Sequence, residues 1–214
     1  MGQYYKVALI KNGEVTPVEN TSGAKLMEHA YYNNDFVDSV MSELAFHGPA
    51  RVAWVGDYAN DRYGDIYETK LPDEVFDDVY HTVWDCGETE EDYREYKARL
   101  EKLTPEWESR TQKRKYKYLV NHTLKAYVNL ETHRKQNKQT STYYDYLSKK
   151  YRTERFCIHP LPLLTACGNG RGGGDYHDKY PGYADVGTWA FDELEVLDKR
   201  PLGYHKAKYC FKEE

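Results

Sequence analysis

The sequence has no apolar run close to the roughly 20 residues that a helix needs to cross a bilayer. It begins without the basic and then apolar segment of a secretory signal. Its few cysteines form no CxxC pair; they are Cys86, Cys157, Cys167 and Cys210. These absences argue against a spanning helix and predict a cytoplasmic protein with reduced thiols and no membrane partner.

Motifs for common cofactors are also missing. The one glycine-rich run is not followed by Gly-Lys-Ser/Thr, so it is not a P-loop, and it lacks the spacing and strand-to-helix context of a dinucleotide fingerprint. No spacing of His, Cys, Asp and Glu matches a standard zinc or iron site. We therefore predict no metal site and leave the cofactor unassigned.

Tyrosine, in contrast, is abundant, with 22 among 214 residues, and aromatic residues make up 15% of the chain. A chain of this length can bury most of its apolar surface in one domain. Each aromatic ring buries a large area, so the rings compensate for a modest apolar content of 40%. We expect a single domain over residues 1–214 with an aromatic-rich core.

Charge is unevenly distributed along a chain whose net charge is −5. Residues 28–95 hold 18 acids and 4 bases, whereas residues 110–155 hold 13 bases and 3 acids. If the basic segment forms a surface, its cations and tyrosines can bind phosphates and stack on bases. Alternatively, the acidic and basic segments pack against each other and neutralise.

The start of the chain predicts a hairpin and a helix. Residues 4–10 and 15–18 are β-rich and flank Asn12-Gly13, which is typical of a tight hairpin turn. Asn34 can cap a helix whose apolar residues recur at three-to-four spacing until Gly48-Pro49. The recurrence predicts that one face of this helix lies in the core.

A buried strand over residues 51–56 comes next, and Asp57 follows its end. The stretch 71–115 then forms a helical, strongly charged section. Within it the spacing of apolar residues and the Thr-Pro-Glu signal predict helices over 73–83, over 89–103 and from Thr104 onward.

The second half of the chain returns to strands. Residues 116–130 alternate around a short turn, and Thr140 or Ser141 can cap a helix that runs to Tyr151. Three later stretches are expected to be extended, namely 155–164, 186–198 and 204–211. Together these elements predict an α+β fold: a single domain with an antiparallel or mixed sheet, and the helical section 71–115 inserted between strands.

The most informative segment is the glycine-rich run, which surrounds one arginine and one carboxylate with five of the fifteen glycines. Its residues are Gly168, Asn169, Gly170, Arg171, Gly172, Gly173, Gly174 and Asp175. Free backbone N–H groups in such a loop can form an anion site, and Arg171 can hold a phosphate or carboxylate bidentately. Alternatively, the run is a chain of tight turns in which Arg171 and Asp175 pair with neighbouring backbone.

Two histidines are candidates for acid–base chemistry. His122 and His159 each lie in or beside an apolar strand, where they can face the glycine-rich run. With Arg171 they would suit cleavage of a phosphodiester, one imidazole accepting a proton and the other donating one. The ordinary alternative is that both are core histidines with satisfied hydrogen bonds.

Several segments together resemble a family of uncharacterised small proteins. They are Met1 to Lys6 (MGQYYK), Gly56 to Ala59 (GDYA), Val120 to Thr123 (VNHT), and the block from His159 to Ala166 (HPLPLLTA) that leads into GNGRGGGDY. The resemblance spans nearly the whole chain and implies one domain in which these segments belong together. It implies no activity.

Two functional hypotheses follow. In the first, the glycine-rich run, Asp57, His122 and His159 form a pocket for a phosphorylated or nucleotide-like small ligand, with Arg171 holding the anion. In the second, the protein is not an enzyme, and its acidic or basic segment docks a protein or nucleic-acid partner. Whether the protein is an enzyme is left open.

Overall fold

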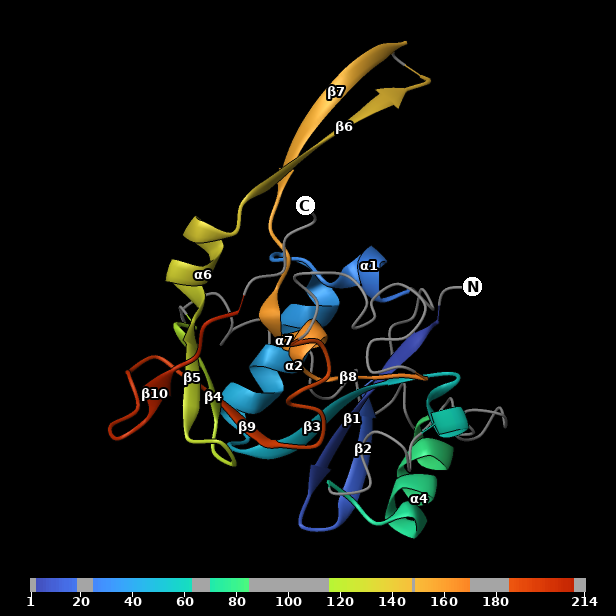
Figure 1. The fold of residues 1–214 in the computed structure, drawn as a ribbon, viewed down its shortest axis with the longest axis vertical. Helices are drawn as coiled ribbons and strands as arrows, with labels where there is room; N and C mark the ends of the chain where they lie inside the picture. The colour runs from blue at the N-terminus through green and yellow to red at the C-terminus, as the bar shows by residue number, and fades with distance from the viewer. Residues whose placement is uncertain are drawn as a thin grey trace.

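The computed structural model describes residues 3–18, 25–62, 70–84, 116–147, 149–169 and 185–209. They form an α+β fold, as predicted, with helices between the strands of a mixed sheet (Figure 1). The strands of this sheet are β1 (Tyr5–Lys11), β2 (Glu14–Val18), β3 (Ala50–Gly56), β4 (Tyr118–Asn121), β5 (Ala126–Asn129), β8 (Ala166–Cys167), β9 (Glu193–Leu197) and β10 (His205–Lys206). The helices are α1 (Leu26–His29), α2 (Asp35–Phe46), the 3-10 helix η1 (Ala59–Arg62), α4 (Asp73–Trp84), α6 (Leu130–Gln136) and α7 (Pro160–Leu164). Two further strands, β6 (Gln139–Asp145) and β7 (Lys150–Phe156), pair with each other and with no other described strand.

The predicted N-terminal hairpin is confirmed. β1 and β2 pair antiparallel from Val7 with Val18 to Lys11 with Glu14. Asn12 and Gly13 in the turn both have positive φ, 54° and 83°. Both central residues of a type I′ turn need this conformation, which explains the Asn-Gly pair.

β3 pairs with three other strands of the sheet, whose order is β10-β5-β4-β9-β3-β1-β2, with β8 paired to β3 off this path. On one edge it pairs antiparallel with β1 along almost its whole length. Its other edge is divided, since Ala50 and Arg51 pair antiparallel with β9, whereas Trp54 and Val55 pair parallel with β8. β3 is therefore one strand at which the described sheet becomes mixed; β5 is another, since it pairs antiparallel with β4 and parallel with β10.

Helix α2 covers one face of the sheet, as the apolar spacing predicts. The Asn34 side chain accepts hydrogen bonds from the N–H groups of Phe36 and Val37, at 3.0 and 3.3 Å. The buried side of the helix carries Val37, Val40, Met41 and Leu44. These side chains share one core cluster with residues of β1 and β3, including the fully buried Trp54.

Helix α4 covers part of the opposite face. Its buried side chains, Phe76, Val79 and Val83, belong to a second cluster that contains Ala53 and Val55 of β3. β3 thus alternates, with Val52 and Trp54 facing α2 while Ala53 and Val55 face α4. This burial on both faces accounts for the uninterrupted apolar run of its sequence.

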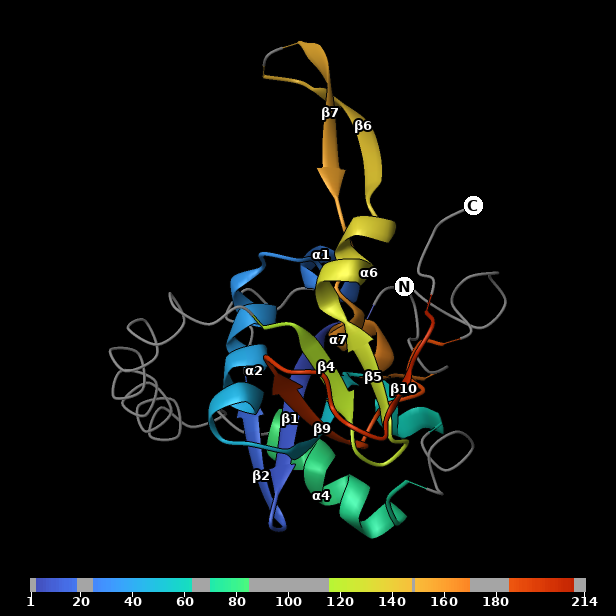
Figure 2. The same cartoon turned by 90° about the vertical axis from the view of Figure 1, so that its left-hand side faces the viewer.

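The helix predicted over residues 140–151 is wrong, because these residues form an antiparallel hairpin. β6 and β7 pair in register from Gln139 with Phe156 to Asp145 with Lys150. We call residues 139–156 the arm, since the hairpin projects away from the rest of the described protein in both cartoon views (Figures 1 and 2). Tyrosine and threonine favour strands, and the cross-strand partners that stabilise a hairpin lie beyond the local window that suggested a capped helix.

Two other predictions need correction. Residues 155–164 are not extended throughout, because β7 ends at Phe156 and α7 begins at Pro160. Proline suits the first turn of a helix, and the side chain of His159 supplies the cap. Of residues 186–198, those up to Phe191 form turns and only β9 is a strand.

The helical section predicted over 71–115 is described only in part. Residues 73–84 form the predicted helix α4. The helices predicted over 89–103 and from Thr104 lie outside the described residues.

We predict that Asn34→Ala lowers the free energy of unfolding by about 1 kcal/mol, because it removes the acceptor for two N–H groups at the start of α2. The measurement is urea unfolding followed by far-UV circular dichroism. Asn34→Asp keeps an acceptor and serves as the control. Equal stability of the two variants would show that the cap contributes nothing.

Candidate functional site

The parallel pair β3 and β8 brings Asp57 close to the glycine-rich run. The last register pair is Val55 with Cys167, and both strands then leave the sheet at the same edge. Asp57 and Asn169 each lie two residues beyond that pair, and Gly168 is buried. Carboxyl ends of parallel strands are a common location for ligands. We call this set the strand-end site: Gln3, Asp57, Gly168 and Asn169.

Asp57 is fixed by the chain that precedes β1. Its Oδ1 accepts a hydrogen bond from the N–H of Tyr4 at 3.3 Å, and its own N–H donates to the Tyr4 carbonyl at 3.1 Å. The hydroxyl of Tyr80 on α4 donates to the Asp57 carbonyl at 2.7 Å. Partial burial raises the pKa of the Asp57 carboxyl from its ordinary value, and the hydrogen bond from Tyr4 opposes this shift.

Gln3 adds a buried amide to the same place. A Cβ at Gly56 would lie 2.7 Å from Gln3 Oε1, so the glycine leaves room for this side chain against β3. The oxygen accepts from the Tyr5 hydroxyl at 2.9 Å. Gln3 is 1% exposed, and within the described ranges its Nε2 has no hydrogen-bond partner. The strand-end site therefore contains a buried amide N–H donor that has no acceptor among the described residues.

The remaining residues predicted in the glycine-rich run lie outside the described part of the chain. They are Gly170, Arg171, Gly172, Gly173, Gly174 and Asp175. The roles assigned to them stay predictions.

His159 occupies a structural position in the core. Its ring Nδ1 accepts from the backbone N–H of Leu161 at 3.2 Å and so caps α7. The backbone N–H of His159 donates to the Ala30 carbonyl at 2.8 Å. Its ring lies 4.5 Å from the Tyr32 ring. Burial lowers the pKa of His159 to about 3, with a smaller contribution from His133. The imidazole is neutral at neutral pH, in the surroundings of a core histidine.

His122 lies in a different environment, at the turn between β4 and β5. Its Nε2 lies 3.0 Å from Glu195 Oε2, and its Nδ1 lies 2.9 Å from the Tyr204 hydroxyl. Because the Glu195 carboxylate can only accept, this contact assigns the imidazole proton to Nε2. A carboxylate-oriented histidine can transfer protons. However, none of the contacts described for His122 involves His159 or the strand-end site.

A second buried histidine, His133 on α6, was not singled out in the sequence. Its Nδ1 lies 3.2 Å from the Tyr32 hydroxyl, which donates to the Leu130 carbonyl at 3.1 Å. The guanidinium of Arg134 lies 5.4 Å from the Tyr32 ring. Tyr32 thus connects α6 to His159, and we call Tyr32, His133 and His159 the root cluster because α6 precedes the arm and His159 follows it. No local pattern in the sequence indicates this cluster.

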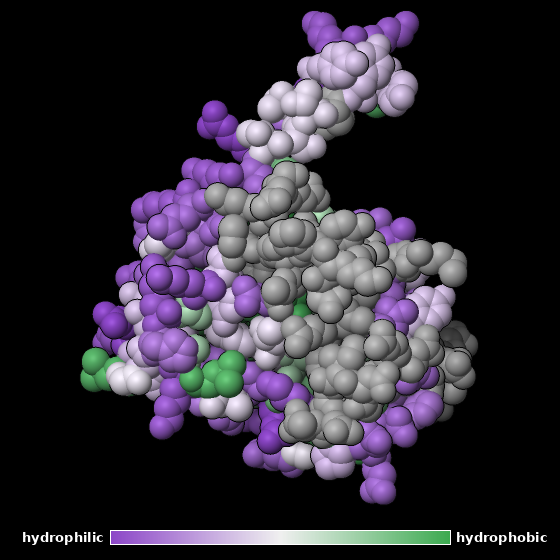
Figure 3. All heavy atoms as spheres, viewed as in Figure 1, coloured by the Kyte–Doolittle hydropathy of each residue, from purple (hydrophilic) through white to green (hydrophobic). Residues whose placement is uncertain are grey.

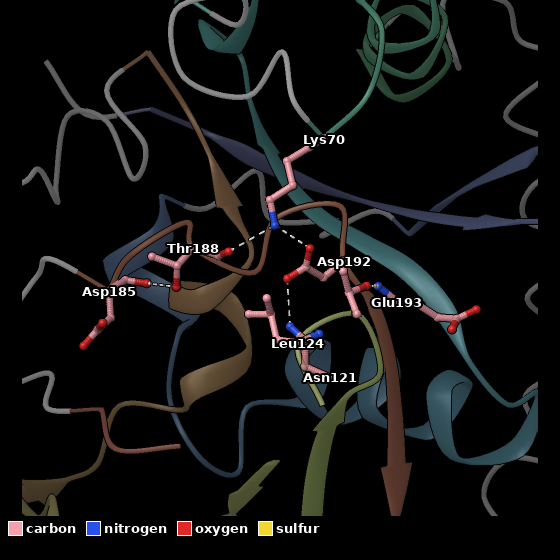
Figure 4. Close-up of polar contacts among 8 residues, drawn as sticks. Lys70, Asn121, Leu124, Asp185, Thr188, Asp192 and Glu193 are labelled. Carbon is pink, nitrogen blue, oxygen red and sulfur yellow. Dashed lines mark hydrogen bonds and ion pairs between the residues drawn. The ribbon is translucent and has the colours of Figure 1, made fainter. Parts of the chain in front are cut away.

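A polar network at the divided edge of β3 was also unexpected. Asp192 is 1% exposed; its Oδ1 accepts from Lys70 Nζ, and its Oδ2 accepts from Asn121 Nδ2 at 2.8 Å (Figure 4). Lys70 also donates to the Thr188 carbonyl at 3.4 Å. The carboxylate is thus paired and hydrogen-bonded, as a buried charge must be. The network ties the β4 end to the segment before β9.

The arm is another candidate functional site, and it is an exposed surface rather than a cavity. Among its described side chains only Asp145, Gln139 and Phe156 are partly buried, and the others are exposed. Tyr146, Leu147 and Tyr151 near the tip are 84%, 98% and 77% exposed. The space-filling view shows the arm rising clear of the body (Figure 3). Large exposed side chains grouped in this way indicate an interaction surface.

The described residues contain neither a metal-binding cluster nor a membrane-spanning helix. No group of three or more His, Cys, Asp and Glu side chains there can hold a metal ion. No helix in the same ranges has the length and apolar character needed to span a membrane.

We predict that the protein loses stability as the pH falls below about 6.5. His29, His133 and His159 have folded-state pKa values of about 4, 4 and 3, lowered mainly by burial, against 6.5 when exposed. Between these values the unfolded chain binds more protons, so the free energy of unfolding falls with pH, by roughly 2 kcal/mol per histidine at pH 5.

The measurement is urea unfolding at pH 7 and pH 5. His159→Asn keeps an acceptor for the α7 cap and removes one titrating group, so its loss between the two pH values should be about 2 kcal/mol smaller than that of the wild type. Comparing each protein with itself removes the effect of the smaller side chain. Equal losses would mean that His159 does not stay neutral in the folded protein.

Comparisons with known proteins place this chain in no family, since no family model, curated protein or solved structure matches it. The family resemblance drawn from the sequence stays a prediction. Function must therefore be argued from the residues alone.

Proposed function

We propose that this protein is an interaction protein that docks a macromolecular partner through the arm. The observation that carries the proposal is the exposure of the arm on both of its faces and at its tip. A buried hairpin would serve the fold, whereas this one contributes no residue to either core cluster beyond the partly buried Phe156.

The energetics support this interpretation. An isolated two-stranded hairpin is marginally stable in water, and no other described strand pairs with either outer edge of this one. Exposed Tyr146 and Leu147 add the cost of hydrating apolar surface. A partner that covers the tip would remove this apolar surface from water.

Charge supports it further. The arm, residues 139–156, contains four Lys or Arg and two Asp or Glu, a net charge of +2, whereas the remaining chain carries −7. In the described structure four acids lie exposed on α4, far from the arm in both cartoon views. The arm is therefore not neutralised by this acidic helix, and its positive charge favours an acidic partner.

We predict that a photo-crosslinking amino acid at position 147 captures the partner in cells. Position 202 is the matched control, because Leu202 is also an exposed leucine, 93% exposed, and lies outside the arm. The measurement is the mass of the crosslinked adducts after nuclease or protease digestion. The same adducts from both positions, or none from position 147, would refute docking through the arm.

A second candidate function is binding of a phosphorylated small ligand at the strand-end site, with Arg171 as the anion-binding residue. The observations that favour it are the common edge at which β3 and β8 end and the buried, unused Nε2 of Gln3. Asp57 would then accept from a ligand hydroxyl, and loop N–H groups would donate to the phosphate.

Arg171→Ala tests this candidate. We expect the wild type to bind inorganic phosphate or a nucleoside monophosphate in isothermal titration, and the variant to bind at least about tenfold more weakly, since a bidentate contact is lost. Arg51→Ala, at an exposed position of β3, is the control. A wild type that binds neither ligand, or a folded Arg171→Ala that binds equally well, would contradict it.

A further inference from the structure

The two faces of the arm differ in chemistry. Side chains alternate along a strand, and Tyr144 pairs with Tyr151 across the hairpin, so the register assigns every position to a face. The face that contains these two rings, here called the ring face, consists of Thr140, Thr142, Tyr144, Tyr151, Thr153 and Arg155. It contains no carboxylate.

Both carboxylates of the arm belong to the opposite face. Asp145 accepts from Arg152 Nε at 2.7 Å, and Glu154 occurs on the same face as Lys150. Opposite charges on this face thus balance. A polyanion is repelled least along the ring face, because no carboxylate lies on that face.

The rings near the tip form one packed group. The Tyr144 ring lies 5.1 Å from that of Tyr146 and 5.2 Å from that of Tyr151, both edge to face. Tyr146 and Tyr151 both contact the Tyr144 ring. They nevertheless remain mostly exposed, so their ring faces are open to solvent. Edge-to-face packing holds each ring in place, which lowers the entropy that a stacking partner must remove.

Two cations lie near the two ends of the arm, one of them on the ring face. Arg155 is near the root of the arm, and Lys149 is in the turn at its tip. Among the described side chains no carboxylate forms an ion pair with either of them. Five residues lie between the two, and six steps of extended chain span on the order of 20 Å. Between them Thr142 and Thr153 present hydroxyl groups 3.0 Å apart.

We propose that the ring face binds single-stranded nucleic acid, an inference that rests on the proposed docking through the arm. Tyr144, Tyr146 and Tyr151 stack on successive bases, while Lys149 and Arg155 contact phosphates at either end. Exposed aromatic faces beside cations are the means by which proteins hold single strands without reading their sequence. In a duplex the bases are already stacked on each other, so the rings select the single strand.

The experiment measures fluorescence anisotropy of labelled oligo-dT and oligo-U of 12 nucleotides, with an unlabelled duplex of the same length and polyglutamate as competitors. We expect both oligonucleotides to bind, and both competitors to displace them poorly. Because base–ring stacking contributes about 1–3 kcal/mol per base, Tyr146→Leu with Tyr151→Leu should weaken binding by about tenfold or more.

The matched control is Tyr4→Leu with Tyr58→Leu, which changes two exposed tyrosines outside the arm, 46% and 43% exposed, and should leave binding unchanged. Circular dichroism checks that both double variants are folded. Lys149→Ala with Arg155→Ala should lower the slope of log Kd against log salt by about 1.4, since each lost phosphate contact accounts for about 0.7.

The outcomes separate this inference from the proposed function. Failure of the wild type to bind the oligonucleotides at low salt, or equal binding by the Tyr146→Leu, Tyr151→Leu variant, overturns the nucleic-acid assignment. If position 147 still crosslinks to a protein or to a second copy of the chain, docking through the arm stands with a different occupant. If position 147 gives no specific adduct and no oligonucleotide binds, both fail.

Discussion

Everything described in this protein is arranged around the backbone pairing of β3, which is buried on both faces and bonded along both edges. One edge belongs to β1, and the other is divided between β9 and β8, which run in opposite directions. At this division the N–H of Trp54 donates to Thr165, and Asp192 pairs with Lys70 and Asn121. The division makes the two strand ends of the strand-end site possible, because only β8 continues parallel to β3.

The root cluster has a corresponding role for the arm. The chain enters the arm from α6 and returns from it into α7, and Tyr32 contacts His133 on the first and His159 before the second. The Tyr32 N–H also donates to the Cys157 carbonyl at 3.1 Å. The root cluster thus holds the two chain segments that enter and leave this exposed hairpin. It fixes where the arm leaves the body and keeps the faces of the arm uncovered.

Local patterns in the sequence were sufficient for the elements whose stabilising contacts are local or periodic. The Asn12-Gly13 turn, the Asn34 cap, the apolar face of α4 and the buried run of β3 were predicted for this reason. The arm was predicted as a helix, because Thr140 and Ser141 are residues that often cap helices. The cross-strand partners that stabilise the hairpin instead are up to 17 residues apart in the sequence. The sequence named Asp57, Gly168 and Asn169, but the pairing of β3 with β8 that brings their strand ends together has no local signal, nor have the network of Asp192 and the root cluster, which join distant residues.

The register pairs also determine the order in which the chain can fold. Every pairing within the arm, from Asp145 with Lys150 to Gln139 with Phe156, lies inside one short stretch, whereas β3 is complete only when Ala50 meets Leu194. Loop closure between such distant residues is slow, and a hairpin closes in microseconds. During synthesis from the N-terminus the ribosome delivers both strands of the arm before it delivers β9. Both strands of the arm are thus synthesised before the sheet of the body can be completed, so a partner of the kind proposed above would meet the arm's tyrosines already on the nascent chain.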